Sequence, residues 1–491
     1  MKSIVTKLRL KPPRGRIPLP REGERVGVRG QAVRRLTLTL TLSLKGERNT
    51  CSNRYDVAAR RCLVVLMLTV ASPLAAQSAE PRDTTAVANA AGQKGKGEKQ
   101  GRSRVRFVMG NHPSLRAGDA LRVDFRVKLH GDFRAFSPDL ATDEGLFDPN
   151  RRRLGIEGTL LKHFEYQLER ELRQDNPWRD VFMNFRYFDN VQIQGGKFKI
   201  PFGLDELTSE MNLDFVYRSR LADDLAPGRD IGVTAHGRFF RRGLGYEAGA
   251  FKRAGEHERF GPNPGGGRTV AGRLMARPFR LSAAPAAVRE LEVAVDATAG
   301  DVTEGPYALR GRMVSGAPYF GGVYVNGRRV RVGVDANWTP GPVSVRGEFL
   351  RLRDERRDEG FGESADLPPL ISQGWYVSST WAVTGEPEAQ GIEPKRPLFQ
   401  GGVGAVELAA RYERIVFGSS APGEPPSRSP RAAKVLESGD RVWTLGVNWY
   451  LNRWARIQLN AVRESLEDAD RSPIMGRTTF WTRVCRLQFV L

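Results

Sequence analysis

From Leu121 onward the chain consists of short runs in which apolar and polar residues alternate one by one. The apolar positions of the first run are Leu121, Val123, Phe125, Val127 and Leu129. The polar positions are Arg122, Asp124, Arg126, Lys128 and His130. Side chains of a β-strand alternate between its two faces, so each run predicts a strand with one apolar and one charged face. A soluble β-sandwich gives the same period, and the pattern alone does not say which face lines a lumen.

The runs recur often enough to predict a large sheet. Further examples lie at 164–172, 181–187, 231–239, 330–338, 443–449 and 457–460. We count about 16 strand candidates, and a weaker run at Tyr307–Ser315 is assigned to a loop because single-chain bacterial barrels usually have even strand numbers. Short turns at 339–342 and 452–453 contrast with long gaps at 255–268, 351–370, 386–399 and 418–440. Such an alternation is typical of an all-β, transmembrane antiparallel barrel, here expected at 119–491.

Aromatic residues cluster near the ends of the expected strands. They are Trp338, Trp375, Trp381, Trp443, Trp449, Tyr450, Trp454 and Trp481. These rings suit the level of the lipid headgroups, where an apolar ring keeps one polar edge wet. The last run places Cys485, Leu487, Phe489 and Leu491 on one face, as expected of a closing strand.

The first 118 residues lack the repeated strand alternation seen in the rest of the chain. Residues 1–56 are of low complexity and are interpreted as a non-structural leader or a start assigned too far upstream. Residues 57–77 combine Arg60-Arg61, the apolar segment CLVVLMLTV and small residues before Gln77, which is the pattern of a secretory signal peptide. Residues 78–118, rich in Ala, Gly, Lys and Gln in their first part, are expected to form a flexible periplasmic segment.

Composition excludes several classes of protein. The net charge of +21 is concentrated at the start, because residues 1–76 hold 16 Lys and Arg against 4 Asp and Glu. Elsewhere the basic residues are mixed with acidic ones, so nucleic acid is not an expected partner. Only Cys485 of the three cysteines follows the signal peptide, which excludes an internal disulfide, and no metal-binding spacing or cofactor motif is present. No hydrolase motif was found either, so we predict no enzyme; a hydrolytic barrel and a plugged structural barrel stay open as alternatives.

One stretch breaks the strand pattern. Residues 195–233 read GGKFKIPFGLDELTSEMNLDFVYRSRLADDLAPGRDIGV, and no alternation holds between Leu204 and Pro227. A loop of this length is uncommon and usually functional. It is expected to fold into the lumen as the segment Leu204–Arg229, anchored by apolar residues and narrowing the path. The expected anchors are Leu207, Met211, Leu213, Phe215 and Val216. An exposed charged loop, or one that caps a neighbouring subunit, is the alternative.

The same stretch carries a family resemblance. The motif GKFKIPFGLDELTS, then Phe215, Tyr217 and Arg218, then PGRDIGV, resembles the phosphate-selective porin O and P family. GWYVSSTWAVTGE, GGVGAVELAARYERI and LGVNWYLNRWARIQLN follow in the same order. The resemblance implies a barrel in the bacterial outer membrane, in contact with lipid and lipopolysaccharide. It also implies passive diffusion of anions such as phosphate or polyphosphate, and a homotrimer. A general porin for other solutes is the alternative.

Anion selection requires positive side chains along the path. The central stretch supplies Lys197, Lys199, Arg218, Arg220 and Arg229 as candidates. The polar faces of the strands add Arg122, Arg126, Lys128, Arg186, Arg238, Arg331, Arg346 and Arg456. Each of these side chains could instead be paired with a neighbouring acid such as Asp124, Asp230 or Glu348. The predicted filter is the triad Arg218, Arg220 and Arg229.

Overall fold

The computed structural model describes residues 105–491 apart from 111, 139, 141–146, 173–177, 256–266, 305–308, 363–364, 390, 422–425 and 433–436. The described residues belong to one compact unit, Lys96–Leu491. The expected leader at 1–56, the signal peptide at 57–77 and residues 78–104 lie outside the described residues.

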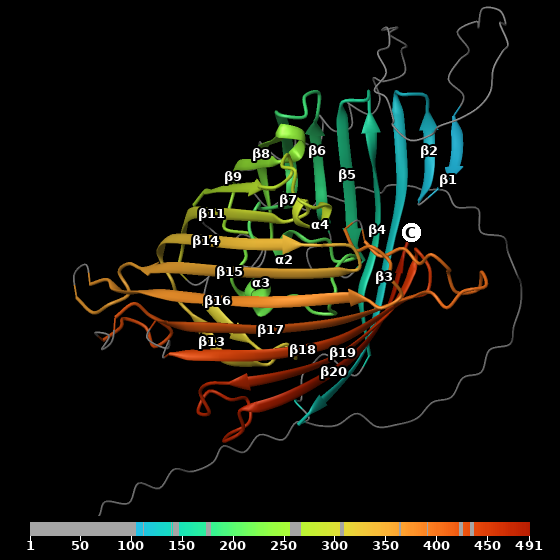
Figure 1. Ribbon diagram of the computed structural model, residues 1–491. Helices are drawn as coiled ribbons and strands as arrows, with labels where there is room; N and C mark the ends of the chain where they lie inside the picture. Colours follow the sequence, from blue (N-terminus) through green and yellow to red (C-terminus); the bar gives the residue numbers. More distant parts are fainter. Residues whose placement is uncertain are drawn as a thin grey trace, which may run out of the picture. The chain divides into compact units, whose positions relative to one another are not determined.

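Sixteen strands of the described chain form a closed antiparallel barrel (Figure 1). Their bounds are β3 Leu121–Ser137, β4 Phe147–Leu160, β5 Phe164–Glu171, β6 Trp178–Phe185, β7 Gln192–Lys199, β8 Arg229–Phe239, β9 Leu244–Phe251, β10 Thr269–Ala276, β11 Glu292–Val302, β14 Gly327–Trp338, β15 Val343–Arg356, β16 Leu367–Ala382, β17 Ala405–Ser419, β18 Ser438–Tyr450, β19 Ala455–Leu466 and β20 Thr479–Val490. Each strand pairs with the next, and β20 closes the ring on β3 from Trp481↔Ser137 to Val490↔Lys128. The predicted all-β barrel of about 16 strands is thereby confirmed.

Two short strands precede the expected start of the barrel. β1 (Arg106–Met109) and β2 (Pro113–Ala117) form a hairpin, and β2 pairs with β3 at Leu121–Asp124. This part of β3 extends beyond the end of β20, so β2 covers an edge that would otherwise be unpaired. Flexibility was expected throughout 78–118, but within its described part the chain is ordered as two strands.

The two faces of the barrel differ as the alternation requires. On β14, for example, Val334 is 53% exposed on the outer face while Asp335 is 4% exposed on the inner face. Tryptophans lie outward at two levels: Trp338, Trp381 and Trp449 near the end of their strands, and Trp375, Trp443 and Trp481 nearer the opposite rim. Six residues of strand separate Trp375 from Trp381, which is about 20 Å. An apolar band flanked by aromatic rings suits a barrel that spans a bilayer. Tyr450 differs from the expectation, because its hydroxyl points inward and donates to Glu407.

The connections divide between two rims. One rim, here the short-turn rim, carries 161–163, 186–191, 240–243 with the 3-10 helix η1 (Phe240–Arg242), 277–291 with α4 (Ala286–Arg289), 339–342, 383–404 and 451–454. The other, the long-loop rim, carries 138–146, 172–177, 200–228, 252–268, 303–326, 357–366, 420–437 and 467–478. The long gap at 386–399 therefore belongs to the short-turn rim.

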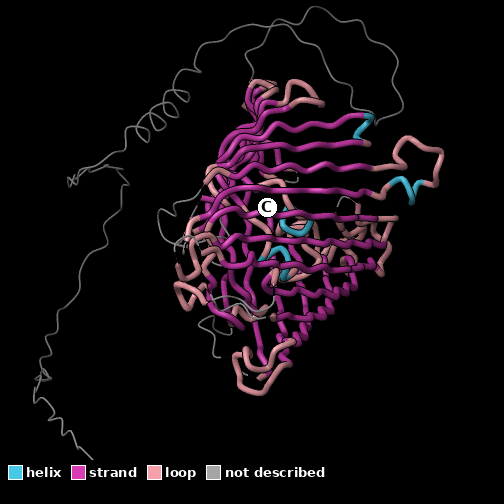
Figure 2. The backbone as a smooth tube through the Cα atoms, turned by 90° about the vertical axis from the view of Figure 1, so that its left-hand side faces the viewer, coloured by secondary structure: helices cyan, strands magenta, loops and turns pink. Residues whose placement is uncertain are grey.

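Two long connections fold into the barrel. The first, residues 200–228, contains α2 (Leu204–Leu207) and α3 (Arg220–Asp224), and α3 contacts β16 and β17. Figure 2 shows short helical segments among the strands. Gly203 turns the chain inward at a φ of 80°, and a Cβ there would lie 2.9 Å from Glu348 Oε1. No helix among the described residues is long and apolar enough to cross a membrane.

The second inward connection, 303–326, contains β12 (Leu309–Arg312) and β13 (Pro318–Val323), which pair only with each other in the described chain. In the weak run Tyr307–Ser315, which is predicted to be a loop, residues 309–312 form β12, but this strand is not part of the barrel. Its fold into the lumen was not predicted. Tyr319 and Phe320 pack on the inward ring of Phe417, at centroid distances of 6.0 and 5.0 Å. The lumen therefore holds two inward segments instead of one.

Candidate functional site

The inward segment 200–228, here called the lumen loop, is fixed to the wall through its backbone. Wall side chains donate to its carbonyl groups: Arg456 to Met211 (3.0 Å), Asn448 to Asp214 (2.7 Å), Arg486 to Val216 (2.9 Å), Arg411 to Tyr217 (3.2 Å) and Arg331 to Leu225 (2.8 Å). Wall oxygens accept from its N–H groups: Asp296 from Gly203 (3.1 Å), Glu348 from Leu204 (2.8 Å), Asn460 from Val216 (2.7 Å) and Glu413 from Arg220 (2.6 Å). Irregular backbone inside a barrel requires such partners, because an unsatisfied buried peptide group is costly.

The wall groups just named, which bind the backbone of the lumen loop, come from one side of the barrel. They lie on β11 and on β14 to β20, and the apolar residues Phe202, Leu221 and Leu225 of the loop pack into the same side. Hairpin β12–β13 joins this cluster through Tyr319 and Phe320. The side of the lumen bounded by β14–β20 is therefore filled, and the open space lies against β3–β9.

Two cavities occupy that open space. The first, about 350 Å³, is lined by Arg126, Lys128, Arg153, Glu157, Gln167, Asp180, Phe182, Gln194, Phe198, Lys199, Leu207, Ser209, Glu210, Arg229, Thr234, His236 and Glu247. The second, about 130 Å³ and nearer the long-loop rim, is lined by Asn150, Arg151, Arg179, Glu206, Glu210, Leu213, Val216, Tyr217, Arg218, Asp223, Arg229 and Arg486. Glu210 and Arg229 line both cavities, so they mark the narrow part between them.

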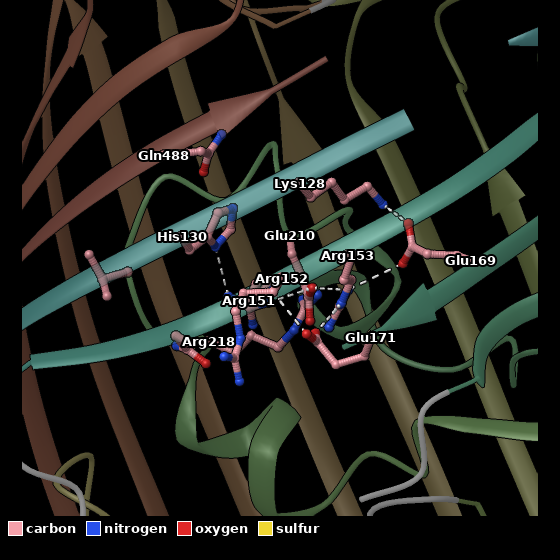
Figure 3. A network of polar contacts seen from close by, with 12 residues as sticks. Lys128, His130, Arg151, Arg152, Arg153, Glu169, Glu171, Glu210, Arg218 and Gln488 are labelled. Carbon is pink, nitrogen blue, oxygen red and sulfur yellow. Dashed lines mark hydrogen bonds and ion pairs between the residues drawn. The ribbon is translucent and has the colours of Figure 1, made fainter. Parts of the chain in front are cut away.

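The narrow part is a network of charges, here called the constriction cluster and defined as Lys128, Arg151, Arg153, Glu169, Glu171, Asp180, Glu210 and Arg229 (Figure 3 shows most of it). Glu210, on the lumen loop, lies 2.7 Å from Arg151 Nε and contacts Arg153. Arg153 also donates through Nε to Glu171 at 2.8 Å. Lys128 is paired with Glu169. Farther along the same wall, Arg229 of β8 binds Asp180 of β6 through two hydrogen bonds of 3.0 Å.

The charge of Glu210 is stabilised by its surroundings. Burial acts to raise the pKa of this carboxyl, but the guanidinium groups of Arg151 and Arg153 hold it well below its usual range. Glu210 is thus ionised at all ordinary pH values and partly neutralises the arginines around it. Together the two cavities are lined by nine Arg and Lys side chains and six carboxylates, which leaves an excess of positive charge.

Five of the predicted selectivity residues line the open space: Lys128 and Arg218, which are described below, and three others. The three others are Arg126, Lys199 and Arg229. Arg126 donates to Glu157 at 2.6 Å, and the ammonium of Lys199 donates to the carbonyl groups of Glu206 and Thr208 (3.2 Å to the second). Lys199 thereby holds the start of the lumen loop while it faces the first cavity.

Several other predicted residues do not face the path. Lys197 lies opposite Ile231, whose side chain is exposed on the outer face, and donates to the carbonyl of Trp178 at 2.7 Å. Arg122 is paired with Asp124 at 2.7 Å near the short-turn rim. Arg331 is fully buried against the carbonyl of Leu225.

Arg218 and Arg220, two members of the predicted filter, mainly hold the lumen loop together. Arg218 lines the second cavity but donates to the carbonyl groups of Asp205 and Thr208 (2.8 Å to the second). Arg220 is 5% exposed and binds Asp223 and Asp224 at 3.1 Å. The physical reason is the same for both: donors inside the barrel are drawn to buried carbonyl and carboxylate oxygens.

The remaining candidates on the barrel wall also divide into residues that line a cavity and residues that are paired or lie elsewhere. Lys128 lines the first cavity. Arg346 donates to Asp214 at 2.8 Å, and Arg456 binds the lumen loop as described above. Arg186 forms a 2.8 Å ion pair with Glu165 in an exposed position, and Arg238 is exposed near the short-turn rim.

Sequence analysis missed Arg151, Arg153 and Glu210, which form the centre of the constriction cluster. The available signal was the run Arg151–Arg153, which interrupts the alternation of β4. A second signal was the charge of the lumen loop itself. Residues 201–227 contain six Asp and Glu but only two Arg, so the segment is acidic, and the positive charge of the path comes from the wall.

A closed barrel with an apolar outer face, a charged inner face and a lumen narrowed by an inward loop defines an outer-membrane porin. Comparison with known families identifies the group. The profile of the family "phosphate-selective porin O and P" matches residues 122–490, and the chain belongs to this family. A search of curated protein sequences finds no significant match.

Solved structures with a similar arrangement include several outer-membrane proteins. A loop L8 deletion mutant of OmpT from Vibrio cholerae is 12% identical, with a TM-score of 0.48, over 75% of this chain and 99% of that chain. OmpF of Salmonella typhi, in complex with daunomycin, is 12% identical with a TM-score of 0.44 over 76% and 98%. The outer-membrane channel DcaP of Acinetobacter baumannii is 9% identical with a TM-score of 0.46 over 75% and 97%.

The docking of α3 is expected to depend on pH through Asp224. Burial raises the pKa of this carboxyl to about 6, although Arg220 opposes the rise. Because the docked form holds the proton more tightly than an exposed Asp, docking should strengthen as pH falls through about 6 and level off near the ordinary value of about 3.9. Hydrogen exchange of the α3 amides, corrected for the intrinsic effect of pH, measures this. An Asp224→Asn variant should lose the dependence; an unchanged dependence would show that another group is responsible.

Proposed function

We propose that this porin passes phosphate and other small anions by diffusion between the lumen loop and the β3–β9 wall. The observation that carries the proposal is the constriction cluster, where Arg151, Arg153 and Arg229 surround the narrow part of the path. Arginine can hold a phosphate through two parallel hydrogen bonds. The carboxylates paired with these arginines reduce the positive electrostatic field. An anion can therefore leave the constriction as well as enter it. The family description supports the same substrate class.

We further propose how the protein is oriented, secreted and assembled in the outer membrane. The long-loop rim faces the outside and the short-turn rim the periplasm, as in other barrels of this class. A signal peptide at 57–77 directs secretion, and three copies assemble as a trimer. N-terminal sequencing of protein from outer membranes and cross-linking in mild detergent test these points; a mature start well upstream of Val57 or a monomer contradicts them.

Arg229 and Asp180 offer a direct test of the filter. Arg229→Gln leaves Asp180 unpaired at the narrow part and should lower the permeability ratio of anions to cations, because field strength at the constriction sets selectivity. Asp180→Asn frees Arg229 and should raise the ratio. The double variant keeps the net charge of the pair and should return close to the wild-type value. Reversal potentials of reconstituted channels under a salt gradient, first with chloride and then with phosphate, give the ratio.

Lys197→Gln is the matched control. Lys197 lies on the same β7–β8 hairpin but on the outer face, so its loss should leave the reversal potential unchanged. If Arg229→Gln and Asp180→Asn shift the potential in the same direction, or not at all while both conduct, the proposed filter is wrong.

A further inference from the structure

The outer face of β17–β20 carries an unusual group of arginines toward the long-loop rim. They are Arg414 on β17, Arg441 on β18, Arg463 on β19 and Arg483 on β20. The neighbouring carboxylate is Glu467, which binds Arg414 at 2.9 Å and Arg441 at 2.8 Å. Arg463 and Arg483 are exposed and have no ion pair or side-chain hydrogen bond with any described residue.

The strand register places these two arginines at the membrane boundary. Arg463 lies directly between Trp443 and Trp481 on the neighbouring strands. Arg483 lies opposite Ala461 and is two residues farther from the rim than Trp481, about 7 Å deeper. A lipid-facing arginine costs up to about 2–4 kcal/mol at the bilayer midplane and less near the interface. An unpaired arginine below the tryptophan level therefore calls for an anionic group from outside the chain.

A groove on the same face includes Arg483 in its lining. Its volume is about 560 Å³, and its outward lining consists of Phe133, Ala135, Leu445, Leu459, Ala461 and Cys485, with Arg483 beside them. The small side chains of Ala135 and Ala461 flank Arg483 on β3 and β19 and leave the space open. An apolar groove with a cationic side chain in its lining matches a molecule that has acyl chains and an anionic head.

We propose that this groove binds the lipid A part of lipopolysaccharide, with a phosphate held by Arg463 and Arg483 and an acyl chain along Ala135 and Ala461. The two arginines are diagonal neighbours on paired strands, so both side chains can reach one phosphate. A phosphate offers several charged acceptor oxygens and offsets the repulsion between the two guanidinium groups. Trp443 and Trp481 flank the head at the level of the leaflet boundary.

The test uses the full barrel, purified, freed of lipid and folded in detergent. Binding of diphosphorylated lipid A, followed through tryptophan fluorescence and native mass spectrometry, should weaken about 25-fold in the double variant Arg463→Gln/Arg483→Gln, since each basic residue near a lipid surface contributes roughly fivefold. Arg353→Gln is the control, because Arg353 is also outward-facing but is paired with Glu355 and lies on β15. Ala461→Phe fills the groove and should weaken binding while both arginines remain.

Further binding measurements distinguish lipid A from other occupants of the groove. Dephosphorylated lipid A should bind the wild type weakly, and millimolar inorganic phosphate should not displace the diphosphorylated form. Equal affinity for both lipids, or displacement by inorganic phosphate, would overturn the proposal. It is likewise overturned if the double variant changes the oligomeric state at unchanged lipid affinity, which would mark an interface between copies. Unchanged channel conductance in all variants confirms that the barrel is folded.

Discussion

Excision of the lumen loop is expected to raise single-channel conductance severalfold and to leave the preference for anions in place. Lys199 and Arg229 are directly paired across β7 and β8, so a two-residue Asn-Gly turn can replace residues 200–228 without disturbing the barrel. The removed segment occupies the lumen and is acidic, with six carboxylates against two arginines in 201–227. Its loss frees Arg411, Arg456 and Arg486 from their loop carbonyl partners.

The conductance and the reversal potential of the channel without the lumen loop show whether the anion filter lies on the loop or on the wall. If Arg218 and Arg220 formed the filter, the permeability ratio of anions to cations would fall toward one. A ratio that stays high places the filter on the wall. The matched control replaces residues 468–471, in the described connection 467–478 of the same rim, with a Gly-Ser linker of equal length and should change neither quantity.

Replacement of Arg220 by Ala is expected to release α3 from the wall. Arg220 is the ion-pair partner of Asp223 and Asp224, and its backbone N–H donates to Glu413. Removal of one partner from a buried charge pair costs about 3–5 kcal/mol, because the remaining charge, here that of Asp224, stays buried and unpaired. Hydrogen exchange at the α3 amides should therefore accelerate by more than about 100-fold.

Two variants make the result specific. Arg453→Ala breaks an exposed pair with Glu393 and should cost no more than about 1 kcal/mol. Asp223→Asn/Asp224→Asn in the Arg220→Ala background should restore part of the protection, since the unpaired charges are gone. Slow exchange in Arg220→Ala itself would show that apolar packing of Leu221 and Leu225 alone holds the helix.

The barrel architecture could be predicted from the sequence because it depends only on the two-residue alternation of apolar and polar side chains. Alternation at 121–130 and its repeats determines strand number and faces, and the loss of alternation after Leu204 indicated the inward segment. The roles of the arginines could not be obtained in this way. Whether Arg218 faces an ion or a carbonyl group depends on the path of an irregular backbone, and no local pattern encodes that path.

The same limit explains the missed residues. Glu210 lies some sixty residues after Arg151 and Arg153 in the sequence. It contacts them only because the lumen loop folds back toward β4. The acidity of the loop was readable from its composition and already argued against a loop filter. The hairpin β12–β13 gave a weak strand pattern, which cannot distinguish a short inward hairpin from an ordinary loop.

The polar contacts between the lumen loop and the wall also bear on the order of assembly. The loop precedes in sequence nearly all of the strands that bind it, and its last partners, Arg486 and Gln488, lie on β20. The carbonyl group of Val216 accepts from Arg486, so this contact can form only once β20 is in place. A docked loop is thus a sign of a completed barrel, and a chain truncated before Thr479 would leave this segment accessible to periplasmic proteases.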